Sequence, residues 1–306
     1  MIKALFIATI ILCCSGLVSP PFALALGLLF GFTVNHPYPD QLRLASKLLL
    51  QGAVVGLGFG MNLHDIIHTG KISFVYTFVG IAVSLLVGHL IGKALQVNAK
   101  SSYLISSGTA ICGGSAIAAV APIIEASDEQ IAVSLGTVFV LNSVALLAFP
   151  PIGTALHLSQ TQFGLWSALA IHDTSSVVGA AAKYGAVALA IATTVKLARA
   201  LWIVPLSLFT AAFRKHKARI QWPWFILLFC VAAMLNTYLP AGAGVYTQLS
   251  RLGKLGLTAT LFLIGSGVSR KTLRQVGVRP LLQGVLLWLM VASVSLFLIL
   301  KNVVHL

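Results

Sequence analysis

Charged side chains are scarce in this sequence, and acidic ones most of all. Only 8% of the 306 residues are charged and Asp and Glu together number 6, whereas 58% of the residues are hydrophobic. A soluble domain devotes about a quarter of its residues to charge. The shortage excludes a water-soluble globular protein. The chain is also too short to combine a set of membrane helices with a separate soluble domain.

Sequence patterns of common enzyme and metal sites are missing as well. The chain contains no nucleophile elbow, phosphate-binding loop or dinucleotide fingerprint. Its four cysteines show none of the paired spacings of zinc or disulfide sites, and no group of histidines has metal-ligand spacing. We therefore predict that the protein is not an enzyme and holds no metal and no cofactor, apart from a coupling Na⁺ or H⁺.

Basic residues outnumber acidic ones by 20 to 6. In a soluble protein this excess would favour nucleic acid as a partner, but in a membrane protein it is what the positive-inside rule produces. We therefore expect the lipid bilayer, and no nucleic acid, as a partner. An excess this large also suits a small anionic solute.

Long apolar runs make up most of the chain, and one transmembrane helix needs about 20 such residues. We predict eleven spans, at roughly 4–18, 21–34, 45–62, 72–95, 103–125, 130–152, 163–183, 185–213, 222–240, 250–268 and 278–300. The expected fold is an all-α polytopic membrane protein, with one integral membrane domain over residues 1–306. Residues 1–19 form either the first span or a signal-like segment, and in the second case ten spans remain.

Two predicted loops are plainly basic and lie two spans apart. One holds Arg214, Lys215, Lys217 and Arg219, and the other holds Arg270, Lys271, Arg274 and Arg279. The positive-inside rule places both in the cytoplasm of a bacterial cell with the chain in its inner membrane. Counting spans from there gives a cytoplasmic N-terminus, a cytoplasmic Lys100 and a periplasmic C-terminus. The acidic turn at Glu125, Asp128 and Glu129 comes out periplasmic.

Two internal echoes are present. Residues 47–70 and 254–277 share glycines at a constant offset of 207, and under the predicted topology the two copies run in opposite directions. Such inverted repeats are typical of secondary transporters, although Gly-rich spans also match by chance. A second echo relates residues 111–117 to residues 171–177, at an offset of 60. Two full spans at this offset would be parallel, so either one segment is broken or re-entrant, or the echo is accidental.

The first candidate site lies in the segment Ser106 to Pro122, whose centre is small and polar. Gly113 and Gly114, followed by Ser115, favour a break in the helix. A break at membrane depth frees backbone groups, which is tolerated only inside protein or along a cavity. The half-helix that resumes would offer N–H donors and a positive dipole end to an anion. The alternative is close helix packing through small residues.

The second candidate site is the polar start of the segment that begins at Ile171. His172 and Asp173 lie in an apolar stretch, and the hydroxyl residues Thr174, Ser175 and Ser176 follow. An ionisable residue inside the membrane is by default a functional hypothesis. Asp173 is the candidate for carrying a proton or coordinating Na⁺, with His172 as the alternative proton carrier. A structural pair buried between helices is the other interpretation.

Lys196 and Arg199 form the third candidate, near the middle of the predicted span 185–213. Residues three apart share one helix face, and two cations at mid-depth need an anion, a carboxylate such as Asp173, or water. Pairing with Asp173 would leave one positive charge for a solute. The alternative is that both side chains extend towards the headgroups or form a structural ion pair.

At these residues the sequence is similar to the YeiH family of bacterial inner-membrane proteins, which is labelled a sulfate exporter family. The similarity covers nearly the whole chain. Its most specific parts are GTAICGGSAIAAVAP at Gly108 to Pro122, HDTSSVVGAA at His172 to Ala181 and VKLAR at Val195 to Arg199. The resemblance implies a relation to cation/proton antiporters and anion transporters with inverted repeats and broken, crossing helices.

Three functions are therefore weighed. The first is a secondary transporter that exports a small oxyanion, such as sulfate or a sulfonate, by alternating access coupled to H⁺ or Na⁺. Lys196 and Arg199 would carry the anion's charge, and uncharged donors would come from Gly113, Gly114, Ser115, Thr174, Ser175 and Ser176. The second function is a sodium/proton antiporter centred on Asp173. The third is a membrane scaffold or sensor subunit without flux of its own. Whether the protein forms a homodimer is left open.

Overall fold

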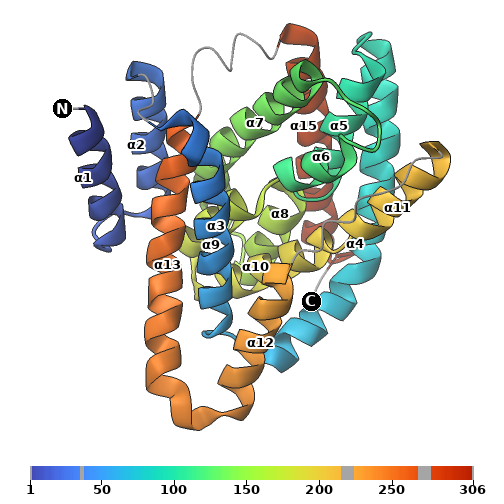
Figure 1. Ribbon diagram of the computed structural model, residues 1–306. Helices are drawn as coiled ribbons and strands as arrows, with labels where there is room; N and C mark the ends of the chain where they lie inside the picture. Colours follow the sequence, from blue (N-terminus) through green and yellow to red (C-terminus); the bar gives the residue numbers. More distant parts are fainter. Residues whose placement is uncertain (1, 35–37, 215–223, 268–276, 305–306) are drawn as a thin grey trace. The chain divides into compact units, whose positions relative to one another are not determined.

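The computed structural model describes residues 2–34, 38–214, 224–267 and 277–304. Its regular structure is helical within these ranges, with no strand (Figure 1). The chain divides into two compact units, each built from two separate stretches of sequence. Unit 1 comprises Met1–His68 and Pro223–Arg270, and unit 2 comprises Thr69–Trp222 and Lys271–Leu306. The prediction that residues 1–306 act as one domain stays a prediction.

Helix α13 is the centre of unit 1. The helices of this unit are α1 (Ile2–Cys14), α2 (Pro20–Thr33), α3 (Pro39–Gly58), α12 (Trp224–Tyr238), the 3-10 helix η1 (Pro240–Gly242) and α13 (Ala243–Ser266). Helix α13 packs against α1, α2 and α3. The rings of Phe6, Phe30 and Phe262 meet with centroids 5.3 to 6.1 Å apart, which fixes α1 and α2 to α13.

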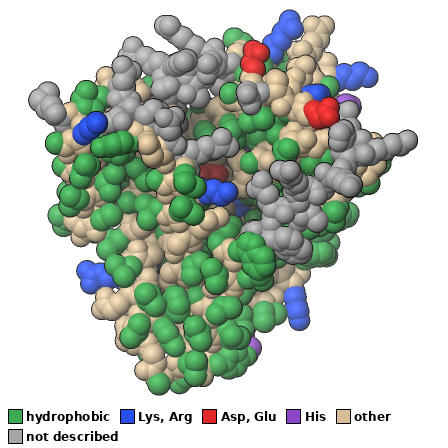
Figure 2. Space-filling view, viewed as in Figure 1, with side chains coloured by type: hydrophobic (Ala, Val, Ile, Leu, Met, Phe, Trp, Pro, Cys, Tyr) green, Lys and Arg blue, Asp and Glu red, His purple; other side chains and the backbone are tan. Residues whose placement is uncertain are grey.

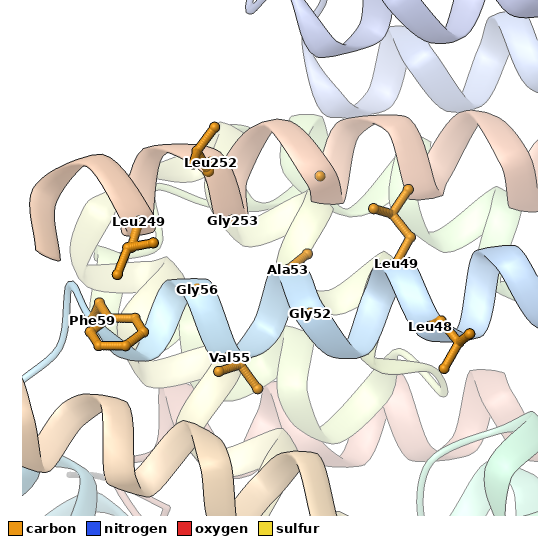
Figure 3. Close-up of a pocket in the computed structure, with 11 residues that line it drawn as sticks. Leu48, Leu49, Gly52, Ala53, Val55, Gly56, Phe59, Leu249, Leu252 and Gly253 are labelled. Carbon is orange, nitrogen blue, oxygen red and sulfur yellow. The ribbon is translucent and has the colours of Figure 1, made fainter. Parts of the chain in front are cut away.

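Helices α3 and α13 cross in opposite directions through glycines. A Cβ added at Gly56 would lie 2.9 Å from the Gly253 Cα atom, and one added at Gly253 would lie 2.7 Å from the Ala53 carbonyl oxygen. Small residues at such a crossing allow two backbones to approach closely. Beside the crossing lies a groove of about 350 Å³ (Figure 3). Its lining is apolar, so it offers little to a polar solute.

The crossing predicts a matched pair of glycine variants. Gly253→Ala is expected to lower the melting temperature in detergent by several degrees, because overpacking costs about 1 to 3 kcal/mol. At Gly52 on α3, an added Cβ would meet no described atom within 4 Å. Gly52→Ala should therefore leave the melting temperature unchanged or raise it slightly. Equal melting curves for the two variants would contradict the close crossing.

Unit 2 contains long helices with broken helices between them. They are α4 (Leu63–Ala94, which begins in unit 1), α5 (Ala99–Ala110), α6 (Gly114–Val120), α7 (Asp128–Ala155), α8 (Gln160–Ala170), α9 (Thr174–Tyr184), α10 (Ala186–Ala200), α11 (Ile203–Arg214) and α15 (Val278–Leu300). Helix α15 packs against α5, α7 and α8. The Gln283 amide of α15 donates to the Gly88 carbonyl of α4 and to the Ser102 hydroxyl of α5. The Trp166 indole of α8 donates to the Ala292 carbonyl.

Four helical stretches within the described residues are long and apolar enough to cross a membrane. They are Leu63–Ala94, Glu129–Ala155, Ala186–Phe213 and Val278–Leu300. The pair Trp224–Tyr238 and Pro240–Ser266, bent by 100°, makes a fifth if it is one span. Hydrophobic side chains dominate the face in Figure 2, where charged ones are few. The protein is therefore polytopic, while the eleven spans stay a prediction. Apart from Arg279, the side chains of the two basic loops lie outside the described residues.

Candidate functional site

Helices α5 and α6 form a hairpin that starts and ends at the same level. An added Cβ at Gly108 on α5 would lie 3.0 Å from the Ile117 Cδ1 atom on α6, so α6 folds back against α5. At the open end, the Lys100 ammonium donates to the Glu125 carbonyl at 2.6 Å. The Gln130 amide donates to the Asn98 amide oxygen at 3.0 Å. Residues 99–125 therefore form a hairpin, the first hairpin, and not the single helix that a span over 103–125 would require; whether the segment crosses or re-enters stays a prediction.

Helices α8 and α9 form a second hairpin, residues 160–184, of the same kind. The Tyr184 hydroxyl donates to the Leu158 carbonyl at 2.7 Å, and the Tyr184 ring stacks on that of Phe163 with centroids 3.8 Å apart. The Gln160 side chain, at the start of α8, accepts from the Val187 N–H at the start of α10. Both ends of the hairpin thus lie side by side, and the predicted span 163–183 is likewise two short helices instead of one long one.

Helix α7 connects the two hairpins and sets their directions. Its 28 residues extend about 42 Å. Gln130, near its start, contacts the open end of the first hairpin, and Leu158, just past its end, contacts the open end of the second. The hairpins therefore enter from opposite ends of α7. Their tips meet, because a Cβ added at Gly113 would lie 3.3 Å from the Asp173 Cβ atom.

The tip of the first hairpin depends on a glycine. Gly113 has a φ of +65°, which side chains rarely tolerate, and its N–H donates to the Gly108 carbonyl. Helix α5 ends at Ala110 and α6 begins at Gly114. The break that the sequence predicts at Gly113 and Gly114 is therefore present. It leaves the last carbonyls of α5 without partners in their own helix.

Arg199 donates to these carbonyls and to those of the second hairpin. Its Nε atom donates to the Ala110 carbonyl at 2.6 Å and its Nη2 atom to the Thr109 carbonyl at 3.2 Å. Its Nη1 atom donates to the Ala168 and Leu169 carbonyls at the end of α8. The side chain is 2% exposed. One guanidinium on α10 thus joins the two hairpin tips.

Lys196 does the same for the second hairpin alone. Its Nζ atom donates to the Ile171 carbonyl at 2.7 Å and lies 3.5 Å from the Ala168 carbonyl oxygen, and the side chain is fully buried. The C-terminal end of a helix carries about half a negative charge. Both cations therefore lie against negative helix ends, and their hydrogen bonds go to backbone oxygens. No contact in the structure tests the prediction that Lys196 and Arg199 bind the solute directly, so it stays a prediction.

Asp173 is the N-cap of α9. Its carboxylate accepts from the Ser175 hydroxyl and from the Ser176 N–H, the latter at 3.2 Å. The side chain is half-buried, whereas Ser175 and Ser176 are buried. The N-terminus of a helix has free N–H donors and a positive dipole end. Asp173 and the predicted hydroxyl donors thus form one cluster, and the carboxylate takes up the donors that an anion would use.

Asn142 of α7 is a site residue that the sequence reasoning missed. Its amide oxygen accepts from the N–H groups of His172 and Asp173, at 3.1 and 3.3 Å. Its Nδ2 atom and both ring nitrogens of His172 are buried and have no hydrogen-bond partner among the described residues. A side-chain amide within the apolar run of α7 could have marked Asn142 as a candidate from the sequence. The tip of the second hairpin therefore holds unused polar groups.

The remaining predicted residues lie at the starts of α6 and α9 and differ in exposure. Thr174 is buried at the start of α9, and Gly114 starts α6. Ser115 is exposed on α6. Within the described ranges, no group of three or more His, Cys, Asp and Glu side chains is placed to hold a metal ion. The site is therefore one of hydroxyls, amides and backbone groups, with one carboxylate and two buried cations.

Comparison with known proteins places the chain in a family. The family described as conserved hypothetical protein 698 matches residues 2–284. The chain belongs to this family. A UPF0324 membrane protein of Bacteroides thetaiotaomicron is 49% identical over 285 residues, which cover 92% of this chain and 86% of the relative. One of Geobacter sulfurreducens is 48% identical over 294 residues, covering 96% of this chain and 95% of the relative.

A third relative, a UPF0324 membrane protein of Bdellovibrio bacteriovorus, is 47% identical and covers 99% of this chain and 95% of its own length. No solved structure matches the chain. The relatives' names state that they are membrane proteins, and with the apolar helices they establish a membrane location for this family member. These names specify no solute, so the similarity to sulfate exporters stays a prediction.

The first hairpin can be tested by labelling from one side of the membrane. Single cysteines would be introduced by Ala99→Cys, Glu129→Cys and Leu156→Cys, all at exposed positions, after replacement of the four native cysteines. An impermeant maleimide should label positions 99 and 129 from the same side and position 156 from the other side. Labelling of 99 together with 156, and of 129 from the other side, would show that residues 99–125 cross the membrane.

Removal of the Arg199 guanidinium, which donates to carbonyls of both hairpin tips, is expected to destabilise the protein strongly. Arg199→Met keeps the apolar stem but leaves the carbonyls of both tips without their donor, and a hydrogen bond to a charged group contributes about 1.5 to 3 kcal/mol. We expect a fall in the melting temperature of about 5 °C or more. Lys183→Met, which removes the exposed cation at the end of α9, is the matched control and should change it little.

Proposed function

We propose that the protein is a secondary transporter that exports a small oxyanion, with sulfate or a sulfonate as the best candidate, by alternating access coupled to H⁺ or Na⁺. The observation that carries this proposal is the meeting of two hairpin tips that enter unit 2 from opposite ends of α7. Non-helical backbone at membrane depth is tolerated where it is buried in protein or lines a cavity. In secondary transporters, discontinuous helices form the solute site.

An inverted repeat accounts for the echo at an offset of 60. The two helices that follow the breaks begin at Gly114 and Thr174, 60 residues apart. Each hairpin is followed by a long helical stretch, α7 or Ala186–Phe213. Because the hairpins open towards opposite ends of α7, the two copies have opposite directions. The objection that two full spans at this offset would be parallel no longer applies, since neither segment crosses.

The proposed topology changes at one place. The first hairpin returns to its own side, so Glu125 and the acidic start of α7 lie on the cytoplasmic side with Lys100. The second hairpin then opens to the periplasm. Removing two crossings leaves the proposed sides of both termini unchanged, with the N-terminus cytoplasmic and the C-terminus periplasmic in a bacterial inner membrane. The other nine predicted segments remain as proposed spans.

The charges at the tips favour an anion as the solute. Two helix C-termini and two helix N-termini meet here, so their partial charges largely cancel. Lys196 and Arg199 then outweigh the single carboxylate of Asp173, which leaves one positive charge in the site. The hydroxyls and N–H groups at the start of α9 are donors suited to sulfate oxygens. A cation would instead need more acceptors than this tip offers.

Asp173 also supports a second candidate, a sodium/proton antiporter on the same fold. A half-buried carboxylate with a nearby hydroxyl, that of Ser175, provides oxygen ligands for a cation. Under this alternative, Na⁺ would move protons without any oxyanion. The two candidates therefore differ in a property that one flux measurement reports.

The test is flux of radiolabelled sulfate into proteoliposomes, with and without Na⁺ and proton gradients. We expect gradient-dependent sulfate flux, and a loss of about tenfold in Ser175→Ala, since a hydrogen bond to a charged group contributes about 1.5 to 3 kcal/mol. Ser295→Ala, whose hydroxyl bonds only within α15, is the control and should match the unmodified protein. Proton movement driven by Na⁺ and indifferent to oxyanions would favour the antiporter. Absence of both would favour the scaffold or sensor alternative.

A further inference from the structure

Asp173 already fills the place that an anion would take at the start of α9. Its carboxylate accepts from the Ser175 hydroxyl and the Ser176 N–H. These are donors of an 11-residue helix, whose N-terminus attracts negative charge. A second anion brought to the same donors would meet the carboxylate's charge and find its hydrogen bonds in use. The protein therefore contains an internal competitor for its own proposed solute.

A second observation indicates that a ligand is expected at this tip. The Nδ2 atom of Asn142 is buried and has no hydrogen-bond partner among the described residues, although Asn142 is only 3% exposed and its oxygen is bonded to the same tip. The ring nitrogens of His172, which is 1% exposed, are also without partners there. A buried polar atom without a partner costs about 1 to 3 kcal/mol. A bound oxyanion would accept from the Asn142 amide and remove that cost.

We propose that the Asp173 carboxylate and the transported oxyanion compete for the donors at the start of α9, so that each bound oxyanion is accompanied by one proton on Asp173. The proposal rests on the proposed function and specifies how H⁺ is coupled to the solute. It also adds the Asn142 amide as a donor to the solute. Sodium has no part in this step.

The step is a proton transfer from water. A carboxylate oxygen of Asp173, half-buried and within reach of water, forms an O–H bond with a proton from the aqueous phase. The neutral acid is a weaker acceptor, so it gives up the Ser175 and Ser176 donors. The oxyanion then accepts from the Ser175 hydroxyl, the Ser176 N–H and the Asn142 amide. On the other side the oxyanion leaves, the proton returns to water, and the carboxylate takes up its donors again. Sulfate and one proton together carry one net negative charge, so a membrane potential that is negative inside drives this export.

The other titratable groups around this tip are few. From α10, Lys196 and Arg199 face this tip, where they donate to the Ile171 and Leu169 carbonyls. Cys112 lies in the first tip, next to Gly113. Helix α7 contributes the uncharged Asn142 and Val138. Lys196 and Arg199 donate to backbone carbonyls, so their positions stay fixed while Asp173 changes its protonation.

The simplest alternative is that Asp173 is only a helix cap, as Asp often is at this position. Asp173→Asn separates the two roles. The amide oxygen of Asn still accepts from the Ser176 N–H, so the cap is kept, but the side chain neither carries charge nor takes up a proton. A cap alone predicts that this variant binds the solute with the same pH dependence as the unmodified protein.

The experiment is calorimetric titration of the purified full-length protein with choline sulfate, without sodium, over a range from neutral to mildly acidic pH. Two buffers with different ionisation enthalpies count the protons taken up. Sulfate itself stays ionised in this range. We expect one proton per sulfate and an affinity that rises up to about tenfold for each unit of pH lowered. Asp173→Asn should bind with no proton uptake and no pH dependence.

Asn142 is tested in the same titration. Asn142→Asp keeps the oxygen that accepts from residues 172 and 173 but loses the Nδ2 donor and adds charge, so sulfate affinity should fall about tenfold or more at every pH. Ser143→Ala, at the next position with a hydroxyl bonded within α7, should leave it unchanged. Melting curves confirm that each variant is folded.

The outcomes separate the two proposals. Sulfate binding without proton uptake, or the same pH dependence in Asp173→Asn, would overturn the competition and leave the oxyanion transporter standing. Equal affinity in Asn142→Asp would overturn the role of Asn142. Ethanesulfonate is titrated in the same way as sulfate. If neither compound binds at any pH, the oxyanion assignment of the proposed function is wrong, and the proposed competition is wrong with it.

Discussion

Backbone carbonyls released at the two helix breaks are the constraint on which unit 2 depends. A helix that stops at mid-depth leaves its last carbonyls without partners, and in a hydrocarbon environment each costs several kcal/mol. Here two cations of α10 supply the missing donors, to Thr109 and Ala110 on one side and to Ala168, Leu169 and Ile171 on the other. The hairpins, the meeting of their tips and the position of Asp173 all follow from this arrangement.

The same arrangement explains why the sequence indicated the polar residues but not the contacts that they make within the protein. Glycine pairs, an acid and two cations within apolar runs are expensive in a membrane, so His172, Asp173, Lys196 and Arg199 stand out in one sequence. Whether a buried Arg donates to a solute or to backbone oxygens depends on which helix ends surround it. That information comes from the tertiary structure, and no spacing of residues reveals it.

The sequence predicted a break in the first hairpin but left open whether the segment crosses or re-enters, for a physical reason. A hairpin of 12 and 7 helical residues with its turns has the same length and hydropathy as one full span, so residues 99–125 read as a crossing helix. The offset of 60 between the echoes did contain the information, because it conflicts with two crossing segments. Asn142 was missed since a single amide on α7 is less conspicuous than a charge, and its role depends on the N–H groups of the second tip.

The charged and the uncharged polar groups at the tips differ in how firmly they are bound. The two cations are held by permanent partners, whereas the hydroxyls, the Asn142 amide and the helix N–H groups at Asp173 are weaker donors that can exchange partners. In the proposed transporter, such a site would attract an anion by positive charge without binding it too tightly to release.

The guanidinium of Arg199 has one further consequence, which concerns movement. Because it donates to carbonyls of both hairpins at once, neither tip can swing away alone without breaking bonds in a medium that offers no replacement. A gate made of one opening hairpin is therefore costly in this protein. The two tips are better suited to move together as a single rigid body. In the proposed transporter, this movement would shift the bound solute relative to the surrounding helices, without local opening of one hairpin.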